Sequence, residues 1–142
     1  MRLEVLSPRE ASIFACVCDT VVAPEPLLPP VRETDAVAAF DRMLAAAPRL
    51  NRIGLRALLY AAELSPRAVG ERARLRRLVP AERARALESI EGSPRAAELA
   101  KLVKGLACLS YYGDRDVMRR VGYDPDERVA RGRQLRAAEL RP

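Results

Sequence analysis

The strongest helical signal in this chain lies between Pro94 and Tyr112, where the sequence reads PRAAELAKLVKGLACLSYY. Apolar residues recur there at the three- and four-residue spacing of an α-helix, and they cover nearly every side of it. Such a helix has to be surrounded by other elements, because water would otherwise meet apolar side chains all round. The segment therefore predicts the central helix of a bundle, ending at Gly113. The residues in register are Leu99, Leu102, Val103, Leu106 and Ser110, with Ala107 and Leu109 beside them.

Five further helices are predicted from similar periodicity, and no segment shows the alternating pattern of a strand. Serine followed by proline favours a helix start, since the hydroxyl can cap the first turn and proline leaves no N–H unpaired. Three such pairs occur, Ser7-Pro8, Ser65-Pro66 and Ser93-Pro94. The fold class is therefore all-α, a single compact bundle of about five to six helices. The other helices are predicted at Pro8–Val22, Asp35–Ala46, Pro48–Leu64, Pro80–Glu91 and Arg115–Val121.

Apolar spacing also predicts which side of each helix faces the core. In the third helix more than one side is apolar, and Gly54 on the main stripe costs about 1 kcal/mol of helix propensity unless it lets a neighbour approach closely. The inward residues expected are Phe14, Val17, Cys18 and Val21 in the first helix; Val37, Phe40, Met43 and Leu44 in the second; and Leu50, Ile53, Ala57, Leu58 and Ala61, joined by Leu55 and Leu59, in the third.

A proline-rich segment follows the first helix, with the sequence APEPLLPP from Ala23 to Pro30. Four prolines in seven positions exclude a helix and favour extended backbone. Leu27 and Leu28 within it predict a strap that lies across the helices. The chain of 142 residues suits one helical domain, residues 1–142, with a charged tail at 126–142.

The composition excludes several classes of chemistry. Histidine is absent, so a Ser-His-Asp triad, a Cys-His pair, a histidine-containing zinc site and a c-type haem motif are all excluded. Glycine-rich phosphate loops are also missing. Asp114 is expected to cap a short helix rather than to bind a metal, and the thiols of Cys16, Cys18 and Cys108 are expected to be reduced, buried small side chains. We therefore predict no catalytic residue, no cofactor and no metal; a small enzyme acting through a cysteine ranks last, because no base is present to activate a thiol.

The chain is basic, with 25 Lys and Arg against 19 Asp and Glu, a net charge of +6. Only Lys101 and Lys104 are lysines, and arginines gather between Arg72 and Arg85. Arginine suits phosphate oxygens, so an alternative function is a helical module that binds nucleic acid. Acidic residues are interspersed among these arginines, however, and favour a solvated helix surface.

Three of the four tyrosines lie in one segment, YYGDRDVMRRVGY from Tyr111 to Tyr123. Tyrosine combines a large apolar area with a polar tip, which suits both the edge of a core and an interface. Tyr111 and Tyr112 therefore either close the end of the bundle or contact a partner.

The pattern Tyr-Tyr-Gly-Asp-x-x-Val-x-x-x-x-Gly-Tyr resembles the C-terminal signature of the gluconate 2-dehydrogenase small-subunit family. The opening Leu6-Ser7-Pro8-Arg9-Glu10 and the stretch CDTVVAP from Cys18 to Pro24 are similar to the start of the same family. The resemblance spans about residues 6–131. The family's helical domain also occurs fused to flavin-dependent glucose–methanol–choline oxidoreductases.

This resemblance implies a companion of an enzyme. In such systems a large subunit carries FAD and the catalytic histidine, and the small subunit supports its assembly or stability. We accordingly predict a non-catalytic subunit that binds a FAD-dependent dehydrogenase of this type. The predicted partner-binding residues are Tyr111, Tyr112, Tyr123, Leu27 and Leu28.

No membrane-spanning segment is predicted, because no apolar stretch approaches the roughly 20 residues that a bilayer requires. Stand-alone members of the family often carry a twin-arginine signal, whereas Met1–Leu6 lacks the charged start and apolar run of a secretory signal. The pattern therefore favours a cytoplasmic protein, with a periplasmic location only if the chain is exported together with a partner.

Overall fold

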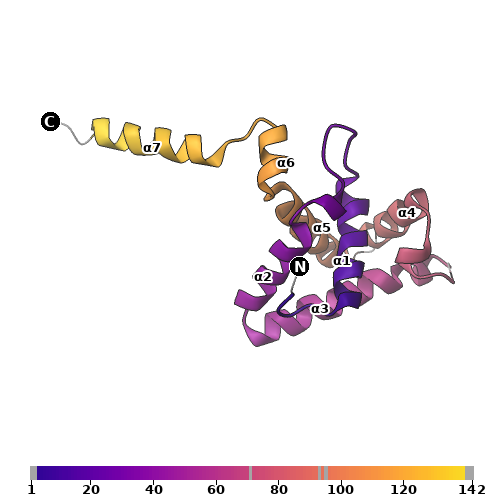
Figure 1. Ribbon diagram of the computed structural model, residues 1–142. Helices are drawn as coiled ribbons and strands as arrows, with labels where there is room; N and C mark the ends of the chain where they lie inside the picture. Colours follow the sequence, from indigo (N-terminus) through magenta and orange to yellow (C-terminus); the bar gives the residue numbers. More distant parts are fainter. Residues whose placement is uncertain (1–2, 71, 93, 95, 140–142) are drawn as a thin grey trace.

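The computed structural model describes residues 3–70, 72–92, 94 and 96–139, and within these ranges the chain is all-α, without a strand. Seven α-helices are present there, one more than the upper expectation, because the charged tail is helical. Six form a bundle, and the seventh extends away from it (Figure 1). The helices are α1 (Pro8–Val22), α2 (Ala36–Ala46), α3 (Arg49–Leu64), α4 (Pro80–Glu91), α5 (Ala97–Tyr112), α6 (Arg115–Arg120) and α7 (Pro125–Glu139).

Helix α1 begins at the predicted cap. The Ser7 hydroxyl accepts from the Glu10 N–H at 3.3 Å, and the Glu10 carboxylate accepts from the Ser7 N–H at 2.9 Å. This reciprocal pair satisfies two N–H groups that a helix start leaves open. On the inner side, Phe14 stacks on Phe40 of α2 with ring centroids 4.0 Å apart. The predicted inward faces of α1 and α2 are thus largely confirmed, except that Met43 lies at the surface.

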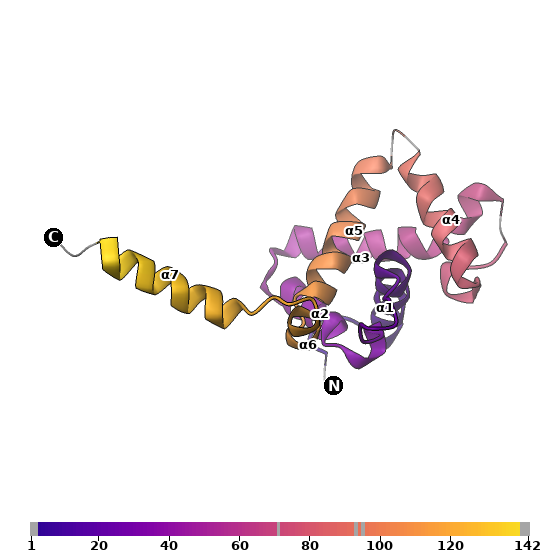
Figure 2. The same cartoon turned by 90° about the horizontal axis from the view of Figure 1, so that it is seen from above.

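Helix α5 is central, as predicted: it contacts α1, α2, α4 and α6 (Figure 2). It begins at Ala97 rather than Pro94, and the predicted cap Ser93 lies outside the described residues. At its end, a Cβ on Gly113 would stand 2.6 Å from the Leu109 carbonyl oxygen, so only glycine fits there. Its buried residues are Val103, Ala107, Ser110 and Tyr111, and the prediction that it is enclosed on nearly every side is wrong for Leu99, Leu102 and Leu109, which are exposed.

Helix α3 turns its predicted main stripe outward, whereas the second predicted face, with Leu55 and Leu59, packs inward. The predicted inward residues Leu50, Ile53, Ala57 and Ala61 are exposed, and Leu58 is half-buried. The buried side carries Leu59, Ala62 and Glu63. This side also directs Arg52 to the end of α2, where its guanidinium donates to the carbonyls of Leu44, Ala45 and Ala47. The inward side of α3 thus combines Leu55 and Leu59 with charged groups that find partners there.

The described part of the connection from α3 to α4 contains two short 3₁₀ turns, Ser65–Val69 and Leu75–Arg77. The Ser65-Pro66 pair does not start a new helix through a serine cap: the Ser65 hydroxyl donates to the Ala62 carbonyl at 2.8 Å. Buried Leu75 anchors the second turn. Helix α4 then runs over the predicted residues and ends at Gly92. In the described part of the chain, no helix has the length and apolar character needed to cross a membrane.

Candidate protein-binding surface

Tyr111 belongs to the core, which corrects its assignment as a partner-binding residue. Its side chain is fully buried, and its hydroxyl donates to the Pro29 carbonyl at 2.6 Å. Burial raises the pKa of the phenol, with a smaller contribution from Tyr112. Tyr111 therefore ties the proline strap to the end of α5, and it offers no surface to a partner in this conformation.

Asp114 is a helix cap, as predicted, but it caps more than its own helix. One carboxylate oxygen accepts from the N–H groups of Asp116 and Val117 in α6, at 2.8 and 3.2 Å. The other accepts from the N–H of Asp35 at the start of α2, at 2.9 Å. Burial by itself would raise the pKa of Asp114, but these three donors outweigh it and lower the pKa. The carboxylate thus fastens α6 to α2.

The strap is held by hydrogen bonds to two of its backbone carbonyls, those of Leu27 and Pro29. Arg120 of α6 donates to the Leu27 carbonyl at 3.1 Å, close to the bond between Tyr111 and Pro29. Leu28 is half-buried against the core, whereas the Leu27 side chain is 80% exposed. Leu27 is therefore available to a partner, and Leu28 chiefly anchors the strap. Figures 1 and 2 both place this turn beside α6.

Tyr112 and Tyr123 are each 42% exposed, in contrast to Tyr111. Tyr112 lies edge-on to the buried Tyr111 ring, with centroids 5.2 Å apart. Two further residues of this region are exposed and were not predicted to bind a partner: Leu109 of α5, which was expected to be enclosed, and Val121 after α6. We give the name tyrosine patch to five exposed apolar residues carried by the strap, by the end of α5 and by the segment that follows α6; they are Leu27, Leu109, Tyr112, Val121 and Tyr123.

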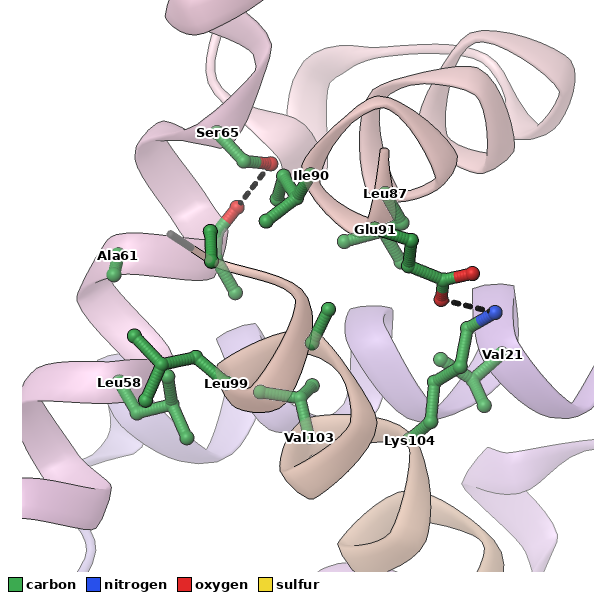
Figure 3. A pocket seen from close by; sticks show the side chains of 13 residues that line it. Val21, Leu58, Ala61, Ser65, Leu87, Ile90, Glu91, Leu99, Val103 and Lys104 are labelled. Atoms are coloured by element: carbon green, nitrogen blue, oxygen red, sulfur yellow. Dashed lines mark hydrogen bonds and ion pairs between the residues drawn. The ribbon is translucent and has the colours of Figure 1, made fainter. Parts of the chain in front are cut away.

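An apolar pocket of about 220 Å³ lies between α3, α4 and α5. Leu58 and Leu99 stand on one side of it, and the Glu91–Lys104 ion pair closes the opposite side (Figure 3). A volume of this size exceeds the roughly 150 Å³ that accommodates benzene in an engineered cavity, but is below that of most small-molecule sites. Ala61 of α3 and Leu99 of α5 both line the pocket and are both exposed. The pocket therefore separates the exposed parts of these two helices.

A second hollow, of about 460 Å³, lies where α2, α5 and α6 meet. Its lining mixes acids with Arg42 and Arg115, and Asp114 there is already occupied as a cap. Among the described residues, no group of three or more Cys, Asp or Glu side chains could hold a metal ion.

Three buried carboxylates hold the bundle together, and sequence reasoning singled out only Glu10. Glu10 pairs with Arg56 of α3 at 2.7 Å, Glu63 pairs with Arg76 at 3.0 Å, and Asp41 accepts from the N–H groups of Glu4, Val5 and Leu6. Burial would raise the pKa of Asp41, but its three N–H donors lower it overall. These binding partners of the three carboxylates lie 13 to 46 residues away in the sequence, and local sequence patterns do not reveal such distant pairs.

The arginines between Arg72 and Arg85 are divided between the interior and the surface. Arg76 is bound to Glu63 and Ser12, and Arg83 donates to the Leu78 carbonyl at 2.8 Å. These two are used structurally. The exposed ones are Arg72, Arg74, Arg77 and Arg85.

The three cysteines are free thiols, but only Cys18 is fully buried; Cys16 and Cys108 are half-buried. Burial raises the pKa of Cys18 to about 12, with Cys108 adding to the effect. Burial also raises the pKa of Cys16. The thiol of Cys18 is therefore protonated at neutral pH, and it donates to the Ala107 carbonyl.

Comparison of the chain with protein-family models, curated proteins and solved structures found no match.

Proposed function

We propose that this chain is a non-catalytic binding subunit whose tyrosine patch contacts a larger protein. The observation that carries the proposal is the incomplete covering of α5. This helix is the centre of the bundle and carries apolar side chains on several sides, yet Leu109 is 68% exposed at its end. An apolar patch left open on a central helix is a typical feature of an interaction site.

The local structure around the patch supports this proposal. Tyr111, Asp114 and Arg120 fasten the strap, α2 and α6 to one another by hydrogen bonds to backbone groups. The backbone that carries Leu27 and Tyr112 is therefore fixed before a partner arrives. A fixed surface loses less conformational entropy on association, which favours affinity.

The partner we propose is a FAD-dependent dehydrogenase of the glucose–methanol–choline type. This assignment rests on the resemblance of Tyr111–Tyr123 and of the chain's start to the gluconate 2-dehydrogenase small-subunit family. The roles of Tyr111 and Asp114 in fastening the fold give a physical reason for such a motif. The proposed role is to support assembly or stability of the flavoprotein.

Affinity purification of the tagged chain from its native host tests the partner. A larger, yellow flavoprotein should be recovered with it. Recovery of the chain alone, or of nucleic acid in place of a protein, contradicts the proposal. The second result would favour phosphate binding by the exposed arginines, with affinity that falls steeply as salt is raised.

Two adjacent tyrosines supply a matched pair of variants. Tyr112→Ala should weaken association with the flavoprotein at least tenfold and lower the melting temperature only slightly, since the ring is partly exposed. Tyr111→Phe should lower the melting temperature, because the Pro29 carbonyl loses its buried donor at a cost of about 1–3 kcal/mol, and should affect association less.

Titration of each variant with the flavoprotein, together with thermal unfolding, measures the two effects separately. If Tyr112→Ala mainly lowers the melting temperature and leaves association unchanged, Tyr112 is a core residue and the patch is wrongly placed.

A further inference from the structure

One face of α3 is exposed, apolar and free of charge. Leu50 is 81%, Ile53 55% and Leu64 41% exposed, so large apolar side chains meet water at both ends of the helix. Small exposed residues lie between them. We name this face the α3 stripe; its members are Leu50, Ile53, Gly54, Ala57, Ala61 and Leu64. Figure 1 shows α3 along the lower edge of the bundle.

The chain gives no internal reason for the composition of the stripe. Gly54 has nothing within 4 Å of the position that a Cβ would take, so no neighbour in the described structure uses the space that glycine leaves. A glycine inside a helix costs about 1 kcal/mol relative to alanine. A close approach by something outside this chain accounts for both the glycine and the exposed leucines.

The stripe is symmetric about Ala57. Leu50 and Leu64 lie seven residues to either side of it, and Ile53 and Ala61 lie four residues to either side. If two α3 helices cross antiparallel at Ala57, Leu50 of one copy meets Leu64 of the other, and the larger Ile53 meets the smaller Ala61. A two-fold axis requires this kind of self-complementary surface.

We propose that the α3 stripe is the contact between two copies of this chain, paired antiparallel about a two-fold axis at Ala57. The small residues at the crossing allow the two helix axes to approach closely. This proposal does not rest on the proposed function, because it uses a different face and needs no flavoprotein.

The charges next to the stripe fit the same arrangement. Arg49, at the start of α3, comes beside the partner helix's C-terminal end, where unpaired carbonyls carry partial negative charge. The two Arg49 side chains stand at opposite ends of the pair, about 24 Å apart along helices of this length, so they do not repel one another. Arg52 and Arg56 are already turned inward, to carbonyls of α2 and to Glu10.

We expect one helix from each copy to bury less than the roughly 1,200 Å² that marks a stable interface. The dimer should therefore form at micromolar or higher concentrations of protein and exchange readily. Sedimentation equilibrium of the full chain should show a concentration-dependent shift from 15.7 kDa toward twice that mass.

A charge placed at the crossing tests the geometry. Ala57→Arg puts two guanidinium groups opposite one another and should weaken the dimer at least tenfold; Ala57 is exposed, so the fold should tolerate the change. Asn51→Arg adds the same charge to an exposed position of α3 outside the stripe and should leave the dimer intact.

Disulfide formation reports the orientation. Ala57→Cys should cross-link to itself under mild oxidation, and a mixture of Leu50→Cys with Leu64→Cys should cross-link more than either variant alone. Asn51→Cys and the natural chain serve as controls for chance collision and for the native cysteines.

Three results overturn the proposal: a chain that stays monomeric at millimolar concentration, a dimer that Ala57→Arg does not affect, and cross-links equally strong at Asn51→Cys. A monomer that floats with phospholipid vesicles and loses this property in Ala57→Arg would assign the stripe to a lipid surface instead.

Discussion

At the scale of single residues, the bundle depends on carboxylates that accept hydrogen bonds from backbone N–H groups. Asp41 binds three such groups in the N-terminal segment, and Asp114 binds three in α2 and α6. Each joins pieces of chain that lie far apart in the sequence. Hydrogen bonds to a charged acceptor are stronger than neutral ones, so these residues matter more than their number suggests.

We predict that Asp41→Asn lowers the stability at neutral pH by about 1–3 kcal/mol, because a neutral amide replaces a carboxylate held by three donors. The folded-state pKa of Asp41 lies below its unfolded value, so its contribution is present above about pH 4 and is lost as the pH falls further. Urea unfolding between pH 2 and 7 should therefore show the curves of the natural chain and the variant converging at acid pH. A constant difference across the range would mean that ionised Asp41 is not the source of the stability.

Adjacent residues show where sequence reasoning stops at this scale. Tyr111 and Tyr112 are neighbours of the same type, and they point about 100° apart on a helix. Nothing in the local pattern indicates which of them faces the strap. The structure separates them because only Tyr111 reaches the Pro29 carbonyl.

At the scale of elements, the boundaries of helices were the most predictable feature. Helices α1 and α4 occupy the predicted residues, since Ser7 with Glu10 starts the first and Gly92 ends the second. These are local signals. The main stripe of α3 was predicted to face inward but lies outward, because Arg52 and Arg56 on the other side bind carbonyls of α2 and Glu10, and those partners are set by the tertiary fold.

We predict that Gly54→Ala stabilises the isolated monomer by about 0.5–1 kcal/mol, since it removes the cost of a helical glycine and the added methyl group meets no neighbour. Thermal unfolding at low micromolar concentration or below should show a rise of a few degrees. Gly105→Ala in α5 is the matched control, because Gly105 also has no neighbour near the added methyl group. Its effect on stability measures helix propensity alone. A loss of stability in Gly54→Ala would show that the space beside α3 is occupied within the monomer.

At the scale of the whole molecule, the six-helix bundle and α7 have different characters. Apolar side chains in α7, such as Val129 and Leu135, are exposed, and arginines and acids are distributed around the helix. A helix of 15 residues without tertiary packing is marginal in water.

Ending the chain after Asp124 should accordingly change the melting temperature of the bundle by less than about 2 °C, because no side chain described in the removed helix, up to residue 137, is buried. Calorimetry of both chains measures this directly. A fall of many degrees would show that α7 packs on the bundle in solution.

Among the exposed apolar residues of the described ranges we distinguish the tyrosine patch and the α3 stripe, and we assign them to different contacts. Tyr112, Tyr123 and Leu27 of the tyrosine patch were predicted to bind a partner. That prediction came from the unusual grouping of tyrosines and from the proline strap. It missed Leu109 and Val121, because periodicity marks apolar residues without showing which of them remain uncovered.

The most direct test of the binding-subunit account is oxidative footprinting of the chain, free and within the complex recovered from its host. Labelling of Leu109, Tyr112 and Tyr123 should fall several-fold in the complex. Labelling of Leu135, an exposed residue of α7 outside the tyrosine patch, should stay the same. Unchanged labelling of the tyrosine patch in a complex that contains the flavoprotein would contradict the account.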